Sequence, residues 1–267
     1  MAPARAPASR SREPFVSVVL TTRDRPQLLA IALACYRHQT YRHRELIVVD
    51  DGPRYPADRA AVEALGGSLI RLDTDNPLGT KLNLGVGAAR GSLCAKMDDD
   101  DWYAPTYLET MIGAVLGRSS QVCRPTIAFT SQFLFFDVAE WTVRLPGSGS
   151  VPGATLVFAR EDWEARPFRR VTHHEDMWFL RDLMDLGVSP LPVLVPDIFM
   201  AVRHAGSRRE RGHTWNHHWL GKDLEAHLRE CPVYRSPEAL LPGWAVQAYR
   251  ELQSELVAGG VPQRDLW

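Results

Sequence analysis

The sequence predicts an α/β fold in which a doubly wound, mostly parallel sheet is covered by helices on both faces. Three observations support this prediction. Short apolar segments alternate with amphipathic segments from residue 15 onward, as in successive strand–helix–strand units. The apolar segments are nearly continuous, which is typical of strands that are buried on both faces. The 267 residues are enough for one large domain or two small ones.

Strands and helices are expected to alternate through the first half of the chain. Residues 1–14 are rich in Arg, Ala, Ser and Pro and hold no apolar stretch, which predicts a disordered tail rather than a secretion signal. A transit peptide ranks second, because Pro3 and Pro7 would break its amphipathic helix. The predicted strands are FVSVVL from Phe15, ELIVV from Glu45, SLIRL from Ser68 and SLCAKM from Ser92, and the predicted helices follow Pro26, run through Ala60 and Leu65, and follow Gly79.

The second half is expected to hold further strands and to end in helices. A basic loop should follow at 203–211, and a helical tail is predicted from Trp219 onward. The predicted elements before that loop are a helix from Pro105 to about Leu116, strands in TIAFTSQFLFF, WTVRL and ATLVFA, a helix over 175–186 and a strand near Val193.

Composition excludes several classes of protein. Apolar residues make up 45% and charged residues 24% of the chain, and 31 Lys and Arg against 32 Asp and Glu leave a net charge of −1. No global field therefore attracts nucleic acid or an anionic membrane. No apolar run approaches the roughly 18 residues of a membrane span. The four cysteines form no C-x-x-C pair, so we expect free thiols and a cytoplasmic protein.

Polar residues follow three of the predicted strands, where ligands bind in open sheets of this kind. The segments are 21–26 (TTRDRP), 50–52 (DDG) and 98–102 (DDDDW). Asp50 is expected to cap or brace its turn, and Gly52 to supply a backbone conformation that other residues resist. The fingerprint G-x-G-x-x-G is missing after the first strand, and no phosphate-binding G-x-x-x-x-G-K-[ST] occurs. A dinucleotide-dependent dehydrogenase and a P-loop NTPase are therefore disfavoured.

The four consecutive aspartates 98–101 favour the binding of a cation. Each pair of carboxylates repels by about 1 kcal/mol in water and by ~4 kcal/mol in a partly dry crevice. On an extended backbone, Asp98 and Asp100 would share one face, and Asp99 and Asp101 would point the other way. Two carboxylates at this spacing suit Mg²⁺ or Mn²⁺. A solvated acidic turn is less favoured, because an apolar strand precedes the run and Trp102 follows it.

A second acidic pair opens the predicted helix at 175–186. Thr172-x-x-Glu175 matches a capping box, in which Glu175 would satisfy the first N–H groups of the helix. Asp176 would then be free for another role, or would interact with the helix dipole. Histidines gather in this half, but His213 does not begin an H-E-x-x-H motif because Thr214 takes the second position, so a zinc peptidase is disfavoured.

Four segments, in order, resemble family 2 glycosyltransferases of the GT-A fold: VSVVLTTRDRP, ELIVVDDG, NPLGTKLNLGVGAARG and KMDDDDWYAP. The resemblance covers roughly residues 15–218. It implies a metal-dependent enzyme that moves a sugar from a nucleoside-diphosphate sugar, most often a UDP-sugar, to an acceptor hydroxyl with inversion. It also implies Mn²⁺ or Mg²⁺ as the cofactor, and the helical tail predicted from Trp219 onward lies beyond the part that the resemblance covers.

The resemblance implies roles for the residues at the strand ends. Asp98 would contact the ribose side, and Asp100 would bind the metal that bridges the diphosphate. The register can shift by one position, so Asp99 or Asp101 could exchange roles with its neighbours. Lys81 stands where the family usually has arginine, and is either a cation near the phosphates or an exposed helical lysine. The donor-binding candidates are Thr21, Arg23, Asp51, Lys81, Asp98, Asp99, Arg208 and Arg209.

On the acceptor side, the resemblance implies that Asp176 of the Glu175-Asp176 pair is the catalytic base. A histidine on a C-terminal loop would complete the metal shell, with His204 and His213 as rival candidates. Arg208 and Arg209 belong to a basic loop that either is solvated or closes over the diphosphate. Most tryptophans are expected in the core, and Trp102 is the exception that we expect first to contact a sugar.

These interpretations divide the chain into four parts. They are a disordered tail (1–14), a nucleotide-binding half (15–104), an acceptor-binding half (105–218) and a C-terminal helical extension (219–267), which packs on the body or on the second subunit of a homodimer. The acceptor could be a small molecule, a natural product or a lipid-linked sugar. Two alternatives remain: a nucleotidyltransferase, which would normally carry a glycine-rich basic loop after the first strand, and a non-catalytic module that binds sugar nucleotides.

Overall fold

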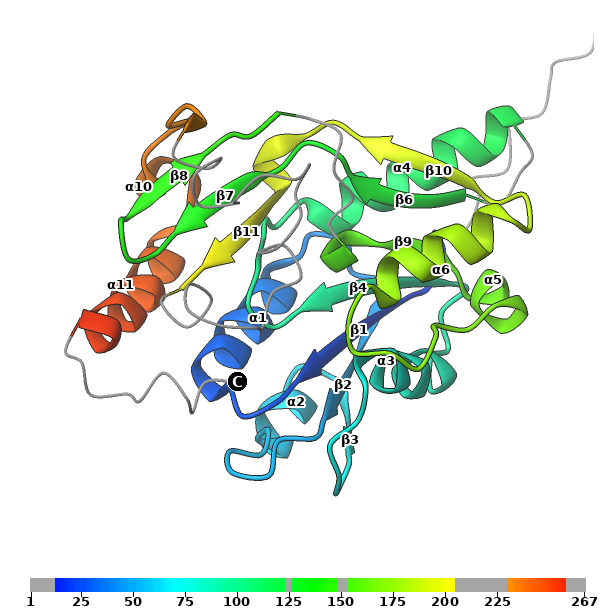
Figure 1. The fold of residues 1–267 in the computed structure, drawn as a ribbon, viewed down its shortest axis with the longest axis horizontal. Coiled ribbons are helices and arrows are strands. Elements are labelled where there is room, and N and C mark those ends of the chain that lie inside the picture. The colour runs from blue at the N-terminus through cyan, green and yellow to red at the C-terminus, as the bar shows by residue number, and fades with distance from the viewer. Residues whose placement is uncertain (1–12, 123–125, 148–152, 205–229, 258–267) are drawn as a thin grey trace, which may run out of the picture.

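The computed structural model describes residues 13–122, 126–147, 153–204 and 230–257, and it shows a mixed α/β fold with two sheets (Figure 1). The larger sheet has the strand order β10-β6-β9-β4-β1-β2-β3, and the smaller one β5-β11-β7-β8. The strands of the larger sheet are β1 (Val16–Thr22), β2 (Arg44–Asp50), β3 (Ser68–Arg71), β4 (Leu93–Asp98), β6 (Thr126–Thr130), β9 (Val157–Ala159) and β10 (Ser189–Val193). Those of the smaller sheet are β5 (Trp102–Tyr103), β7 (Leu134–Asp137), β8 (Thr142–Arg144) and β11 (Phe199–Arg203).

Helices connect most of the strands. Helix α1 begins with Pro26, whose fixed φ suits the first turn, and ends with two basic residues that complement the helix dipole. The described helices are α1 (Pro26–His38), α2 (Arg59–Glu63), α3 (Leu78–Gly87), α4 (Tyr107–Val122), α5 (Arg160–Ala165), α6 (Glu175–Met184), α10 (Pro237–Leu240) and α11 (Gly243–Val257), with single 3₁₀ turns at Gly153–Thr155 and Pro196–Ile198.

The larger sheet is parallel except at β9, which pairs antiparallel with both β4 and β6. Its central strands set the position of the polar residues. Thr21 of β1 lies opposite Asp98 of β4, and Thr22 lies opposite Asp50 of β2. The carboxyl ends of β1, β2 and β4 therefore meet at one edge, as the sequence predicts.

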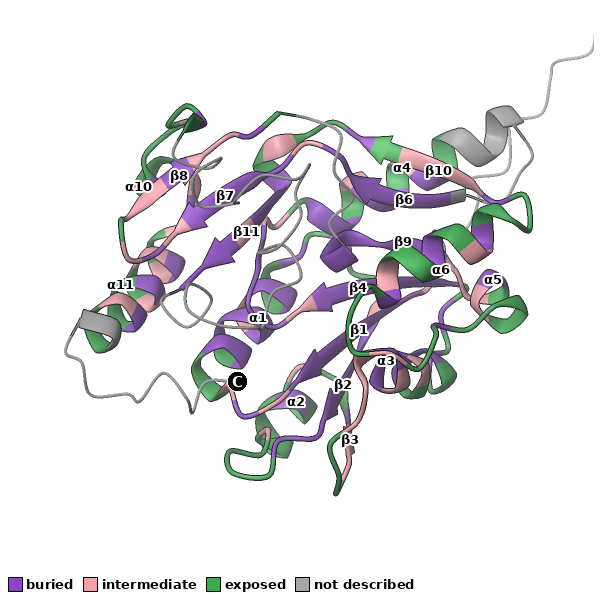
Figure 2. Cartoon of the chain, viewed as in Figure 1, coloured by how far each residue is buried: buried purple, intermediate pink, exposed green. Residues whose placement is uncertain are grey.

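Both faces of this sheet are buried (Figure 2). On β1, Val18 and Leu20 join the apolar core that includes α1, α4 and α11, whereas Val19 joins a second core with Leu82 and Val86 of α3. Full burial of one such side chain contributes about 1.5–3 kcal/mol, so the alternation along β1 fixes a helix layer on each face. The doubly wound architecture is thereby confirmed.

The described part of the C-terminal extension packs on the body of the same chain. Tyr249 of α11 makes an edge-on contact with Phe136 of β7, at 5.1 Å between ring centroids. Trp244 stacks on His38 of α1 and lies 5.5 Å from Trp102. Trp102 is buried in this aromatic contact, so the expectation that it contacts a sugar is wrong.

Two strands differ from the sequence-based expectations. The segment TIAFTSQFLFF is not one strand: β6 ends at Thr130, the N–H of Ser131 makes the last bond to Val193 of β10, and the chain then crosses into β7 of the smaller sheet. Strand β11 was not predicted, although its sequence FMAVR is largely apolar. It lies in parallel beside β7 and runs toward the polar edge of the larger sheet.

Cys35, Cys94 and Cys231 are free and buried, as predicted, while Cys123 lies outside the described residues. Within the part of the chain that the structure describes, no helix combines the length and apolarity that crossing a bilayer requires.

Candidate active site

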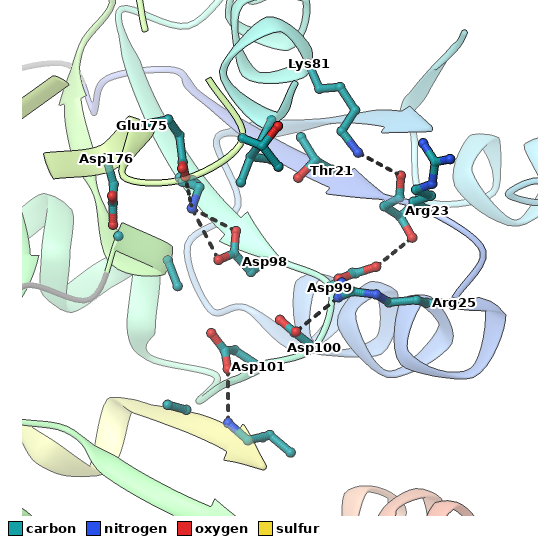
Figure 3. A pocket seen from close by; sticks show the side chains of 18 of the residues that line it. Thr21, Arg23, Arg25, Lys81, Asp98, Asp99, Asp100, Asp101, Glu175 and Asp176 are labelled. Carbon is teal, nitrogen blue, oxygen red and sulfur yellow. Dashed lines mark hydrogen bonds and ion pairs between the residues drawn. The ribbon is translucent and has the colours of Figure 1, made fainter. Parts of the chain in front are cut away.

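A pocket of about 260 Å³ opens where β1 and β4 end (Figure 3). Residues from both halves of the chain line it. The nucleotide-side candidates Thr21, Arg23, Lys81 and Asp98 form one part of its wall, and the segment 172–176 forms another. The larger and the smaller sheet thus enclose one cavity in which most of the described site candidates meet.

Asp51, which directly follows β2, is held by three donors. Lys81 Nζ lies 2.9 Å from its Oδ1, Arg23 Nη1 lies 3.3 Å from its Oδ2, and the backbone N–H of Asn76 donates to Oδ2 at 3.0 Å. Arg23 also pairs with Asp75. Lys81 is buried rather than exposed, so the alternative of a solvated helical lysine is wrong.

The turn after β2 is braced as predicted, but its glycine serves a different purpose. Asp50 accepts the backbone N–H groups of Gly52 and Ala57, both at 2.7 Å, and pairs with Arg71 at 2.6 Å. Gly52 does not have the positive φ that favours glycine. A Cβ at this position would lie 2.5 Å from the backbone nitrogen of Asp24, so the turn needs glycine for the close approach of two chain segments.

Three of the four consecutive aspartates gather into one cluster, Asp98, Asp100 and Asp101. Each offers a carboxylate oxygen, and these oxygens all lie within 4.8 Å of one another. The expected alternation is wrong for Asp101, because β4 ends at Asp98 and residues 99–100 form a turn. Asp101 instead accepts the backbone N–H of Val202 of β11 at 3.0 Å.

Asp99 leaves this cluster and faces β1 and α1. Its Oδ2 accepts the hydroxyl of Thr22 at 2.6 Å, and its Oδ1 pairs with Arg25 at 2.8 Å. Arg25 also reaches Asp100, at 3.0 Å. Burial raises the pKa of Asp99 to about 6, although Arg25 acts in the opposite direction. Asp99 is therefore an internal partner of Arg25 in this structure.

The cluster brings negative charges together at a largely buried place. Burial, followed by repulsion from Asp100 and Asp98, raises the pKa of Asp101 well above its usual range. A bound cation would offset this repulsion. Three carboxylates within this distance supply the hard oxygen ligands that Mg²⁺ and Mn²⁺ accept, so the residues fit a divalent ion.

Helix α6 brings the second acidic pair to the pocket. The capping box is wrong: His174 rather than Thr172 occupies the N-cap, with a left-handed backbone (φ 60°), and its side chain makes no capping hydrogen bond. Glu175 is buried and faces Lys96 at 3.6 Å. Burial, with repulsion from Asp176 and Asp98, raises the pKa of Glu175 to about 7, and Lys96 opposes this shift.

Asp176 lines the pocket and lies against the 3₁₀ turn that begins at Gly153. Its Oδ1 accepts the backbone N–H of Met177 at 2.7 Å. A Cβ on Gly153 would overlap Oδ2 of Asp176 at 1.8 Å and would lie 2.5 Å from its Cβ. The carboxyl group therefore rests directly on the backbone of the turn.

The remaining candidates are not part of this arrangement. His204 directly follows β11 and is buried, but among the described residues it is not in the carboxylate group that could hold an ion. Arg208, Arg209 and His213 lie in 205–229, outside the described residues.

Sequence reasoning missed two cations that contact the carboxylates, Arg25 and Lys96. Lys96 had a detectable signal, since it is the only charged residue before Asp98 in the otherwise apolar strand β4, and lysine is almost never fully buried without a partner. Arg25 carried no such signal, because it precedes a helix in a segment that reads as a polar loop.

Comparisons with protein families and with curated proteins both match this chain to glycosyltransferases. The family model described as Glycosyl transferase family 2 matches residues 17–170. The putative glycosyltransferase EpsH of Bacillus subtilis (strain 168) is 31% identical over 102 residues, which are 37% of this chain and 30% of that protein. An uncharacterized glycosyltransferase of Rickettsia bellii (strain RML369-C) is 28% identical over 101 residues, or 37% of this chain and 15% of that protein. The matched region thus spans less than a third of either relative.

Solved structures share the fold over most of the chain. The mannosyltransferase PcManGT from Pyrobaculum calidifontis, solved in complex with GDP-Man and Mn²⁺, has a TM-score of 0.57 at 16% identity, covering 94% of this chain and 77% of that one. S. aureus TarS 1–349, solved in complex with UDP-GlcNAc, has a TM-score of 0.53 at 16% identity and covers 94% and 70%. These likenesses show a GT-A fold.

Proposed function

The chain belongs to glycosyl transferase family 2 and is a glycosyltransferase, and from this premise we propose that it moves a sugar from a nucleoside-diphosphate sugar to an acceptor hydroxyl with the help of Mn²⁺ or Mg²⁺. A UDP-sugar is the donor we expect. The acceptor is a small molecule, a natural product or a lipid-linked sugar. The reaction inverts the configuration at the anomeric carbon, because a single displacement takes place.

One observation carries this proposal: the carboxylate cluster and Asp176 line the same pocket. The proposed ligands of the ion are Asp98, Asp100 and Asp101, and His204 or His213 is the proposed additional ligand. When bound, the ion neutralises negative charge on the leaving diphosphate. Asp98 also faces the ribose side of the donor in this proposal.

Asp51 is proposed to recognise the nucleoside together with Thr21 and Arg23. The pairing of Lys81 with Asp51 supports a role for Lys81 in fixing that carboxylate rather than in touching phosphate directly. Three donors hold the Asp51 carboxylate, so it can keep one orientation as the donor enters. Arg208 and Arg209 are proposed to contact the diphosphate.

Asp176 is proposed to be the general base. As the acceptor oxygen forms its bond to the anomeric carbon, the proton of that hydroxyl passes to the Asp176 carboxylate. The bond between the anomeric carbon and the diphosphate oxygen breaks, and its electron pair leaves with the nucleoside diphosphate. Glu175, which is buried beside Asp176, would influence its position.

A panel of UDP-, GDP- and dTDP-sugars tests this function. In the presence of Mn²⁺ we expect release of nucleoside diphosphate from one donor class. Asp176→Asn should lower kcat by about 10²–10⁴-fold and leave the Kd for the nucleoside diphosphate within about twofold. A non-catalytic binding module would show equal, negligible turnover in both proteins. If no donor of the panel is consumed, the proposed function fails.

A further inference from the structure

Lys96 is a buried lysine whose two partners come from the two sides of the pocket. Its side chain is 4% exposed. Its Nζ lies 3.0 Å from Oδ1 and 3.2 Å from Oδ2 of Asp98, and 3.6 Å from Oε1 of Glu175 (Figure 3). Asp98 follows Lys96 by two residues on β4, so both side chains leave the same face of the strand. Glu175, in contrast, is the first residue of α6.

Burying a lysine at this position costs free energy unless its charge is paired with carboxylates. Burial of an ammonium group opposes its charge, and the carboxylates of Asp98 and Glu175, at 3.0 and 3.6 Å from Nζ, offset that cost. Removal of Lys96 would leave Asp98 and Glu175 facing each other without a cation. Removing one partner of a buried ion pair destabilises a fold more than replacing the whole pair by apolar residues.

The bridge fixes the first turn of α6, where Asp176 lies. The side chain of the N-cap residue His174 makes no capping hydrogen bond, and Asp176 Oδ1 itself accepts the first-turn N–H of Met177. Glu175 is held by Lys96 on one side, and Asp176 rests on the backbone of Gly153 on the other. Two independent contacts therefore determine how far the Asp176 carboxyl group lies from the residues that follow β4.

We propose that Lys96 is a positioning residue: it joins Asp98 on the donor side to Glu175 on α6, and thereby sets the distance between the bound nucleotide and the base Asp176. This inference rests on the proposed function. Because its action is indirect, Lys96 should affect the rate of transfer more than the affinity for the donor. The competing explanation is a cation that only stabilises the folded chain.

The first experiment does not depend on activity. Hydrogen–deuterium exchange of residues 172–178 is compared in the wild-type protein, Lys96→Met, Glu175→Gln and the double variant. We expect amide exchange in this segment to accelerate about tenfold or more in each single variant, and the double variant to exceed neither by more than about twofold, since both changes remove one interaction. Unchanged exchange in Lys96→Met, or additive effects in the double variant, would overturn the proposal. If Lys96→Met does not fold, Glu175→Gln and Gly153→Ala test the two supports of α6 separately.

The second experiment separates positioning from general stability. Lys96→Met and Glu175→Gln should each lower kcat by about tenfold or more with KM for the donor within about threefold. Lys81→Met is the matched control, because it removes another buried lysine whose partner Asp51 lies on the nucleotide side, and it should chiefly raise KM. Equal changes of kcat and KM in Lys96→Met and Lys81→Met would contradict a positioning role. If the wild-type protein consumes no donor, the proposed function fails, while the exchange experiment still decides whether the bridge exists.

Discussion

The backbone N–H of Val202 donates a hydrogen bond of 3.0 Å to Oδ1 of Asp101. Val202 belongs to β11, which lies beyond residues 17–170, the region that matches the family model. This bond joins the smaller sheet to the carboxylate cluster at the end of β4. The candidate site therefore includes residues on both sides of the family-matched boundary, and a chain truncated at that boundary would lack one support of Asp101.

Asp100 and Asp99 are predicted to have different roles, Asp100 in binding the ion and Asp99 in stabilising the fold. Asp100→Asn should weaken Mn²⁺-dependent binding of a nucleoside diphosphate by at least about tenfold, or ~1.4 kcal/mol, because it removes an oxygen of the cluster. Asp99→Asn is the matched control. Its carboxylate pairs with Thr22 and Arg25, so this change should lower the free energy of unfolding by roughly 1–3 kcal/mol and alter ion binding less. Calorimetry measures ion binding and urea unfolding measures stability. Equal loss of ion binding in both variants would contradict the different roles predicted for Asp100 and Asp99.

Replacing glycine by alanine is predicted to change the free energy of unfolding in opposite directions on helices α3 and α4. A Cβ on Gly85 of α3 would lie 2.4 Å from Cγ1 of Val19 on β1. Gly85→Ala should therefore destabilise the fold by about 1–3 kcal/mol through overpacking. Gly113 of α4 is exposed, and a Cβ there meets nothing within 4 Å, so Gly113→Ala should stabilise by roughly 0.5–1 kcal/mol. Urea unfolding of both variants checks this pair, and a neutral Gly85→Ala would show that α3 can move away from the sheet.

The sequence is a good guide where a feature depends on neighbouring residues. Apolar strands and amphipathic helices are local patterns, and the polar residues after Thr21, Asp50 and Asp98 meet because parallel strands end at one edge of the sheet. The arrangement within the aspartate run was not accessible, since the place where β4 ends determines whether Asp101 alternates or joins its neighbours. The backbone N–H that Asp101 accepts belongs to Val202, which is distant in sequence.

The wrong prediction of a capping box at α6 also arises from contacts between residues that are distant in sequence. A capping box at Thr172 and Glu175 is locally plausible, but Glu175 is drawn into the pocket wall by Lys96, and His174 takes a left-handed conformation instead. Lys81 was ambiguous for a similar reason, because only the folded chain places Asp51 beside it. Long-range charge pairs of this kind leave no periodic signal in a sequence.

Glu45 is predicted to make stability depend on pH. Burial alone would raise its pKa, but hydrogen bonds from Ser17 Oγ (2.6 Å) and from the backbone and guanidinium of Arg90 outweigh burial and hold the pKa below its usual range. A lowered folded-state pKa stabilises the protein above the unfolded value, and this contribution is lost as pH falls through the folded-state pKa. The free energy of unfolding should therefore decrease below about pH 5.

Glu45→Gln provides the control for that pH dependence. The amide cannot titrate, so the variant should be less stable than the wild-type protein at neutral pH, and the difference should shrink as pH falls. Urea unfolding between pH 7 and pH 3.5 measures the difference at each pH. A constant difference over the whole range would show that the carboxylate of Glu45 contributes through packing rather than through charge.

Calorimetric titration of the protein with UDP, GDP and dTDP, each with and without Mn²⁺, tests the central claim most directly. The claim is that Asp98, Asp100 and Asp101 hold a divalent ion which in turn holds a diphosphate. The account predicts that one nucleotide binds at least about tenfold more tightly when Mn²⁺ is present and that Asp100→Asn removes this difference. Equal affinities with and without Mn²⁺ for all three nucleotides would contradict it.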